Sequence, residues 1–214
     1  YICESILAQL AFIPIYVLVV TIIIEQFIEK KDKESMLSKL NVIIGVFLNE
    51  MGREILKEFS TVDNNFSNLK DKLEFTQDNF NTQYKDAIKF LKKYQGNFEC
   101  NSNNLSKLKD YIISKKQVLL IMMENPNLME NDSFTELMLA LFHLYEELCH
   151  RDDFTKLSKS DLNHLALDVN RAYILLLNEW LHYLKHIDEK YPYLFSLEIR
   201  INPFSSENKA ELKD

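Results

Sequence analysis

Two Glu-x-x-His sequences are the part of this chain whose residue types and spacing most plainly allow chemistry. Glu147-Leu-Cys-His150 and Glu179-Trp-Leu-His182 each place a carboxylate and an imidazole three positions apart, on one helix face. Helical bundles that hold two iron or manganese ions use two such pairs and one further Glu from each of two other helices. The further glutamates that fit this pattern are Glu50 or Glu54, and Glu124. The sequence therefore allows a metal centre for dioxygen or redox chemistry.

The same region carries pairs of potential ligands at four-residue spacing. These pairs are His143 with Glu147, His164 with Asp168, and His182 with His186. Two imidazoles at this spacing can share one zinc ion. A His–Asp pair at this spacing is more often a local hydrogen bond, and the spacing defines no third ligand. The chain is therefore expected either to bind no cofactor or, as an alternative, to bind zinc, iron or manganese.

Two observations favour the simpler interpretation without a metal. Glu-x-x-His matches arise by chance in a helical chain rich in Glu, and His150 adjoins the charged sequence Arg151-Asp152-Asp153. The sequence also contains no nucleophile elbow, phosphate-binding loop, Gly-rich dinucleotide turn or Cys-x-x-Cys pair. Cys100 and Cys149 lack cationic neighbours that would stabilise a thiolate. We therefore expect a non-enzymatic protein with no catalytic residues.

The longest apolar stretch runs from Ile6 to Ile24 and contains no charged residue. Its exceptions are Gln9, Pro14, Tyr16 and Thr21. A helix of this length covers roughly the ~30 Å hydrocarbon core of a bilayer. The stretch is apolar on all sides, unlike the helix of a soluble core. It predicts a transmembrane helix, within a membrane segment at residues 1–29.

The residues that flank this stretch predict its orientation. Lys30, Lys31 and Lys33 follow it, and no Lys or Arg precedes it. The positive-inside rule then places the N-terminus outside the cell and the C-terminal part in the cytoplasm. Three widely spaced cysteines, in no paired pattern, agree with a reducing compartment. Because the chain begins with Tyr1 rather than Met, we expect residues upstream of it.

The rest of the chain has the composition of one helical domain. Only 3 Gly and 4 Pro occur in 214 residues, which favours an all-α fold. Residues 30–204 form this predicted domain, a bundle of about five helices continuous with the membrane helix, and residues 205–214 form a polar tail. All 25 Lys and Arg residues and all but three of the 32 acidic residues follow position 29. This mild acidity argues against nucleic acid as the main partner.

Apolar residues at three- and four-residue spacing predict the helices of this bundle. The predicted ranges are 30–60, 80–95, 105–125, 133–150 and 158–190. Residues 193–201 leave two interpretations open, since Pro192 suits the first turn of a helix, whereas the alternating apolar residues that follow also suit a strand.

Two segments resemble a family of uncharacterised prokaryotic proteins anchored in the membrane. They are LSKLNVIIGVFLNEMG and HLALDVNRAYILLLNEWLHYLKHIDEKYPYLFSLEIRINPF. The resemblance covers the membrane segment, the helix after it and the last third of the chain, but not residues 64–131. It implies one N-terminal span and a cytoplasmic all-α domain, and no activity. His150 and His182 are not part of the pattern that carries it.

The predicted function is therefore a membrane-tethered cytoplasmic interaction or scaffold module. A long amphipathic helix leaving the membrane is well placed to pack against copies of itself, so we expect a homo-oligomer or a complex with another membrane protein in the bilayer. The first alternative is the metalloprotein with Glu147, His150, Glu179 and His182 as ligands. The second is an oligomeric pore, in which Gln9, Pro14 and Thr21 line a channel or make helix contacts.

Overall fold

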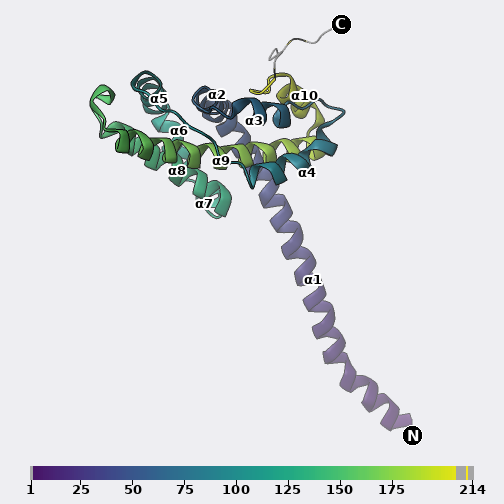
Figure 1. Cartoon of the computed structure of the whole chain (residues 1–214). Coiled ribbons are helices and arrows are strands. Elements are labelled where there is room, and N and C mark those ends of the chain that lie inside the picture. Colours follow the sequence, from purple (N-terminus) through teal and green to yellow (C-terminus); the bar gives the residue numbers. More distant parts are fainter. Residues whose placement is uncertain (1, 206–210, 212–214) are drawn as a thin grey trace. The chain divides into compact units, whose positions relative to one another are not determined.

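A computed structural model describes the backbone of residues 2–205 and of residue 211, and the side chains of residues 12–205 and 211 (Figure 1). All regular elements in this described part are helical, apart from an isolated bridge between Asp63 and Phe98, so the all-α prediction is confirmed. The α-helices are α1 (Ile2–Phe47), α2 (Arg53–Ser60), α3 (Phe66–Leu73), α4 (Phe80–Leu91), α5 (Ser102–Ser114), α6 (Lys116–Met123), α7 (Pro126–Met129), α8 (Asp132–Cys149), α9 (Lys159–Lys190) and α10 (Pro192–Arg200).

The prediction of about five helices in the bundle is wrong, because nine α-helices follow α1 in the described residues. Part of the difference lies in the range 105–125, which breaks at Lys115 into α5 and α6. Residues 193–201, for which helix and strand were both open, belong mainly to helix α10, with Pro192 in its first turn. The predicted tail at 205–214 lies almost entirely outside the described residues.

The chain divides into two compact units, residues 1–42 and 43–214, which are described separately. In the first unit, α1 is long and apolar enough to cross a membrane, and none of its most apolar window is buried. Phe12, Tyr16 and Phe27 expose 52%, 66% and 71% of their surface. Pro14, Thr21 and Ile24 lie within the helix, as do Ile6 and Gln9, whose side chains are outside the described part.

The second unit begins with a change of helical geometry. Residues Leu48–Gly52 form a π-helical turn between the end of α1 and α2. Such a turn leaves carbonyl groups without their usual helical partner, and the Tyr111 hydroxyl donates a hydrogen bond to the Met51 carbonyl at 3.2 Å. One turn earlier, a Cβ added to Gly45 would lie 2.6 Å from the Tyr183 ring. Glycine at this position therefore permits close packing against α9.

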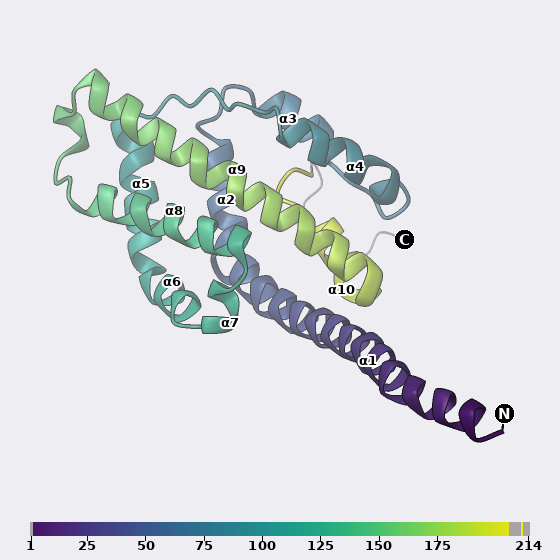
Figure 2. The ribbon, with the colours of Figure 1, turned by 90° about the horizontal axis from the view of Figure 1, so that it is seen from below.

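Helix α9 is the centre of the second unit. It spans 32 residues and packs against α2, α4, α8 and α10, which surround it in Figure 2. Its buried face includes Tyr173, Leu177, Trp180 and Leu184. Tyr173 meets the Phe59 ring of α2 edge-on, with 5.8 Å between ring centroids. Because several helices bury apolar side chains against α9, this helix holds the others in register.

A partly buried ion pair joins α2, near the start of the second unit, to α10, near its end. Arg53 in α2 donates hydrogen bonds from one nitrogen to both carboxylate oxygens of Glu198 in α10, each at 2.9 Å. Glu198 is only 6% exposed. A buried charge without a partner is costly, so this pair positions α10 against α2.

Candidate metal centre

The side chains of the candidate site come from α8 and α9, which run side by side in opposite directions (Figure 2). The Asn131 side chain caps α8 by accepting a hydrogen bond from the Phe134 amide, and Ser158 caps α9 in the same way at the Asp161 amide. The predicted start of α9 at Ser158 is thus confirmed. The apolar faces of both helices are buried, which leaves an adjacent polar face on each.

Four polar residues meet where these faces adjoin. They are His143 and Glu147 of α8, and His164 and Asp168 of α9. Spacing of four residues places each pair on one face of its helix. The antiparallel arrangement brings His143 beside Asp168, and Glu147 beside His164. His143, Glu147 and His164 each offer one ligand atom, and these three atoms lie within 4.8 Å of one another.

The side-chain nitrogen and oxygen atoms of these four residues lie 3.4–3.5 Å apart where they face each other across the cluster. Asp168 Oδ2 lies 3.4 Å from the Nε2 atom of His143 and 3.4 Å from the Nε2 atom of His164. His164 Nε2 lies 3.5 Å from Glu147 Oε2. Nitrogen–oxygen hydrogen bonds are normally about 2.9 Å long. Two atoms that each bind a tetrahedral zinc ion at about 2.1 Å are separated by about 3.4 Å. The separations therefore match those between two ligands of one ion, and they are equally those of ion pairs if the imidazoles are protonated.

The Asp168 carboxylate is the most buried member of the cluster. It is 3% exposed, and Oδ2 has no hydrogen-bond partner among the described residues. Leaving a buried acceptor unpaired costs about 1–3 kcal/mol. Its other oxygen, Oδ1, lies 3.5 Å from Arg171 Nη1. The carboxylate is thus held from one side, while its unpaired atom faces two imidazoles.

Glu147 differs because it already has a strong partner. Arg151 Nη1 donates a hydrogen bond to Glu147 Oε2 at 2.6 Å, and Arg151 Nη2 lies 3.8 Å from Asp161. The hydrogen bond from Arg151 lowers the pKa of Glu147, as do the neighbouring charges, whereas burial opposes the shift. Glu147 therefore stays ionised but is partly neutralised. His143, Glu147 and His164 are the three residues whose ligand atoms lie within 4.8 Å of one another, and Asp168 adds a carboxylate whose Oδ2 atom has no hydrogen-bond partner among the described residues.

The four ligands predicted from the Glu-x-x-His sequences have different surroundings. Glu147 belongs to the cluster, but His150 is exposed at the end of α8, where its Nδ1 atom lies 2.8 Å from the Glu146 carbonyl oxygen. Glu179 is 4% exposed, and burial raises its pKa although a hydrogen bond with Ser133 opposes the shift. His182 is exposed. Among the described residues, only Glu147 of these four joins a group able to share an ion.

The other residues considered as ligands are also accounted for. Glu50 pairs with Lys115 at 3.6 Å, Glu54 pairs with Lys57 at 3.5 Å, and Glu124 is exposed. The Nε2 atom of His186 is buried without a hydrogen-bond partner among the described residues, and burial lowers the pKa of this imidazole. These positions are separate from the cluster.

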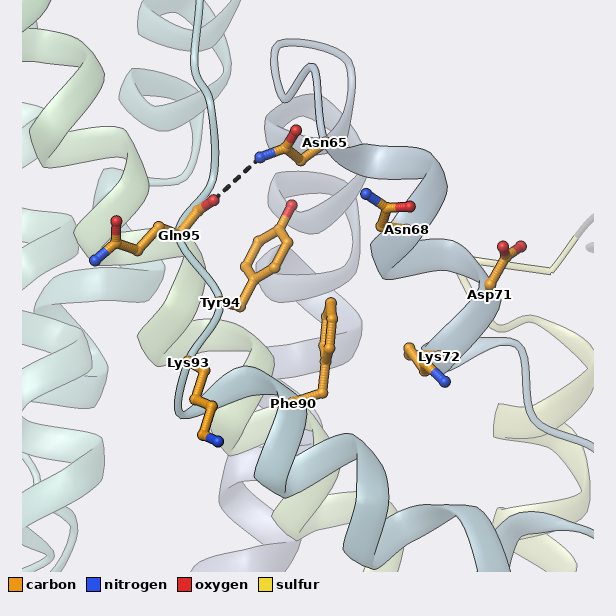
Figure 3. Close-up of a pocket in the computed structure, with 8 residues that line it drawn as sticks. All are labelled: Asn65, Asn68, Asp71, Lys72, Phe90, Lys93, Tyr94 and Gln95. Atoms are coloured by element: carbon orange, nitrogen blue, oxygen red, sulfur yellow. Dashed lines mark hydrogen bonds between the residues drawn. The ribbon is translucent and has the colours of Figure 1, made fainter.

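A hollow separate from this cluster lies between α3 and the end of α4, with a volume of about 470 Å³ (Figure 3). Its lining is Asn65, Asn68, Asp71, Lys72, Phe90, Lys93, Tyr94 and Gln95. The Asn65 amide donates a hydrogen bond across its rim to the Gln95 carbonyl at 3.2 Å, and the Tyr94 hydroxyl is bound to the buried Asp63. Most of its polar side chains are exposed, and none of them has the unpaired, buried character of Asp168.

Comparison with known proteins identifies the family but no activity. Residues 36–200 match the family described as "Uncharacterized protein MJ1433, C-terminal helical domain", and residues 1–28 match "MJ1433, N-terminal helical domain". The uncharacterized protein MJ1433 of Methanocaldococcus jannaschii is 42% identical over 208 residues, which cover 97% of this chain and 83% of that protein. No solved structure matches the chain. The resemblance to an uncharacterised family is confirmed, and the chain belongs to the MJ1433 family of helical proteins.

Proposed function

We propose that this protein is a membrane-anchored metal-binding protein whose helical unit holds one divalent ion of the zinc class between α8 and α9. The observation that carries the proposal is the position of Asp168 Oδ2, buried, unpaired and 3.4 Å from two imidazole nitrogens. Two His and one carboxylate are a ligand set that zinc sites use. The same donors also bind iron or manganese.

The ion would join two helices that are already in contact. His143 and Glu147 belong to α8, and His164 and Asp168 belong to α9, so coordination ties the two helices near their connection. Three protein ligands leave a tetrahedral ion with one open position. His143 and His164 have side chains that are 43% and 52% exposed, so solvent reaches this position. The site therefore suits an ion that exchanges or that binds a further ligand.

The proposal is tested by metal analysis of the full chain purified in detergent. We expect about one zinc, iron or manganese ion per chain by elemental analysis, or binding of one zinc ion after treatment with a chelator. His143→Ala and His164→Ala each remove a ligand and should weaken zinc binding at least about 100-fold, since loss of an outer-shell partner alone costs about 10–100-fold.

The matched controls are His150→Ala and His182→Ala, which remove exposed imidazoles outside the cluster. These variants should bind zinc like the unaltered protein. Equal zinc affinity in His164→Ala and His182→Ala would exclude the centre, as would a chain that binds no divalent ion.

Membrane anchoring through α1 is part of the proposal. Its support is the exposed apolar surface between Phe12 and Ile28 and the lysines at 30, 31 and 33 that follow. This arrangement favours an external N-terminus and a cytoplasmic helical unit. In intact cells, a membrane-impermeant maleimide should label Cys3 and leave Cys149 unlabelled. Labelling of both cysteines, or extraction of the protein by alkaline carbonate, would contradict the anchored orientation.

Self-association of the anchored chain is a second candidate function. The exposed apolar surface of α1 favours it, because one helix can bury such surface against lipid or against another copy. Light scattering of the detergent-purified protein tests it: a defined oligomer supports a self-associating scaffold or a pore, and a monomer excludes self-association.

A further inference from the structure

We propose that the metal-loaded centre binds a phosphate group, with Arg171 as the protein's second contact to that group. This inference rests on the proposed metal site. The phosphate would occupy the open position on the ion with one oxygen and meet the Arg171 guanidinium with another. The ligand class is inorganic phosphate or a soluble phosphate monoester.

The first support is the position of Arg171. His164, Asp168 and Arg171 follow one another at four- and three-residue spacing, so they share one face of α9. Arg171 Nη1 lies 3.5 Å from Asp168 Oδ1, while Oδ2 of the same carboxylate faces the two imidazoles. The two oxygens of one carboxylate therefore face the guanidinium and the ion's place, which puts Arg171 and the ion in the same cluster.

The second support is exposure. The Arg171 side chain is 61% exposed, so an anion in solvent can reach it. His143 and His164 are partly exposed on the same cluster, which leaves the ion open on its solvent side. By contrast, Arg151 is 18% exposed and already bound to Glu147. Arg171 is therefore the guanidinium of this cluster that is available to a ligand.

The third support is charge. The carboxylates of the cluster and its rim are Glu147, Asp161 and Asp168, and the guanidiniums are Arg151 and Arg171. With neutral imidazoles, three acids against two bases leave one negative charge, which disfavours an anion. A divalent ion converts this to one positive charge. Anion binding should consequently depend on the metal.

The chemistry of these groups favours phosphate. A guanidinium presents N–H groups in a planar fork that matches two phosphate oxygens, and a divalent ion accepts a third. The two imidazole side chains of the site are 43% and 52% exposed, so much of their surroundings is solvent. The ligand is therefore recognised by its charged oxygens rather than by an organic group.

Cobalt(II) is the probe that tests this inference without activity. Tetrahedral cobalt has strong visible absorption bands that change when a further ligand binds. The full chain in detergent is loaded with cobalt and titrated first with inorganic phosphate and then, in a separate arm, with phenyl phosphate. A third arm uses nanodiscs with phosphatidic acid, compared with nanodiscs of phosphatidylcholine. We expect a saturable spectral change with a soluble phosphate.

Arg171→Gln should keep the cobalt spectrum and weaken the phosphate response at least about tenfold, because a charge-assisted contact is lost. Lys190→Gln removes the same charge from the other end of α9 and should leave the response unchanged. A wild-type chain without a cobalt spectrum would refute the metal site itself. A normal cobalt spectrum without any phosphate response, a response only to phosphatidic acid, or an equal response in Arg171→Gln would refute the phosphate inference alone.

Discussion

The Asp168→Asn variant tests whether Asp168 is a metal ligand or a member of a structural ion pair. The two roles predict opposite effects on the stability of the metal-free protein. In the metal site, Asp168 Oδ2 is a buried acceptor without a partner, which costs about 1–3 kcal/mol until an ion binds. The amide of Asn removes the buried charge and can donate to an imidazole nitrogen. We expect the metal-free variant to be about 1 kcal/mol more stable than the unaltered chain.

With zinc bound, the unaltered chain should instead be more stable than Asp168→Asn. A ligand present at 100 times its dissociation constant raises the free energy of unfolding by about 2.7 kcal/mol. In a protein of about 150–250 residues, each kcal/mol raises the melting temperature by about 2–4 °C, so zinc should raise it by about 5–10 °C in the unaltered chain. Asp168→Asn should lose most of this rise, since the amide is a poor ligand.

The assay is thermal unfolding of the detergent-purified chain, once with a chelator and once with zinc. Asp188→Asn is the matched control, because it makes the same change on α9 at a carboxylate that contacts Lys185 at 3.4 Å, away from the cluster. If instead Asp168 mainly pairs with protonated imidazoles, Asp168→Asn will destabilise the metal-free protein. A destabilised metal-free variant with an intact zinc effect would refute the metal interpretation.

Three further predictions concern stability, and each is measured by denaturant unfolding. Burial raises the pKa of Glu179 above its ordinary value of 4.5, so its contribution to stability should fall as pH rises from about 4.5 through the folded-state pKa. Glu179→Gln should remove this decline and add about 1 kcal/mol at pH 7; an unchanged pH profile would contradict it. Gly45→Ala should cost about 1–3 kcal/mol because its Cβ meets the Tyr183 ring, and a neutral effect would show that the ring moves aside. Arg53→Met leaves Glu198 buried without its partner and should cost about 3 kcal/mol, with most of the loss recovered in Arg53→Met/Glu198→Leu; a double variant no better than the single would argue against the pairing.

The long helices could be predicted from sequence because their signals are local. Ser158 provides a cap for α9, and apolar residues at helical spacing continue to Lys190, so both ends were predictable. The break at Lys115 between α5 and α6 has no such signal, since neither Gly nor Pro stands there. Tertiary packing places this break, and a pattern within one helix does not contain that information.

For the same reason, the sequence predicted the residue pairs of the candidate site but not that the two pairs meet. Each pair, His143 with Glu147 and His164 with Asp168, could be recognised because it lies within one helix. Their meeting depends on how α8 and α9 align after they reverse direction. The sequence did contain a signal for this alignment, because the pair His143 and Asp168 and the pair Glu147 and His164 are centred on the same point of the connection. The Glu-x-x-His pattern misled because it cannot tell that Glu179 faces the core.

The central position of α9 affects how the protein folds during its synthesis on the ribosome. Helices α2 to α8 are synthesised before the helix on which several of them pack. At a translation rate of about 5–20 residues per second, roughly 7–30 s separate the end of α1 from the end of α9. During this interval the apolar faces of the earlier helices have no completed core to cover them. A nascent chain stalled before Lys159 should therefore be readily cleaved by protease, and release past Lys190 should make it resistant.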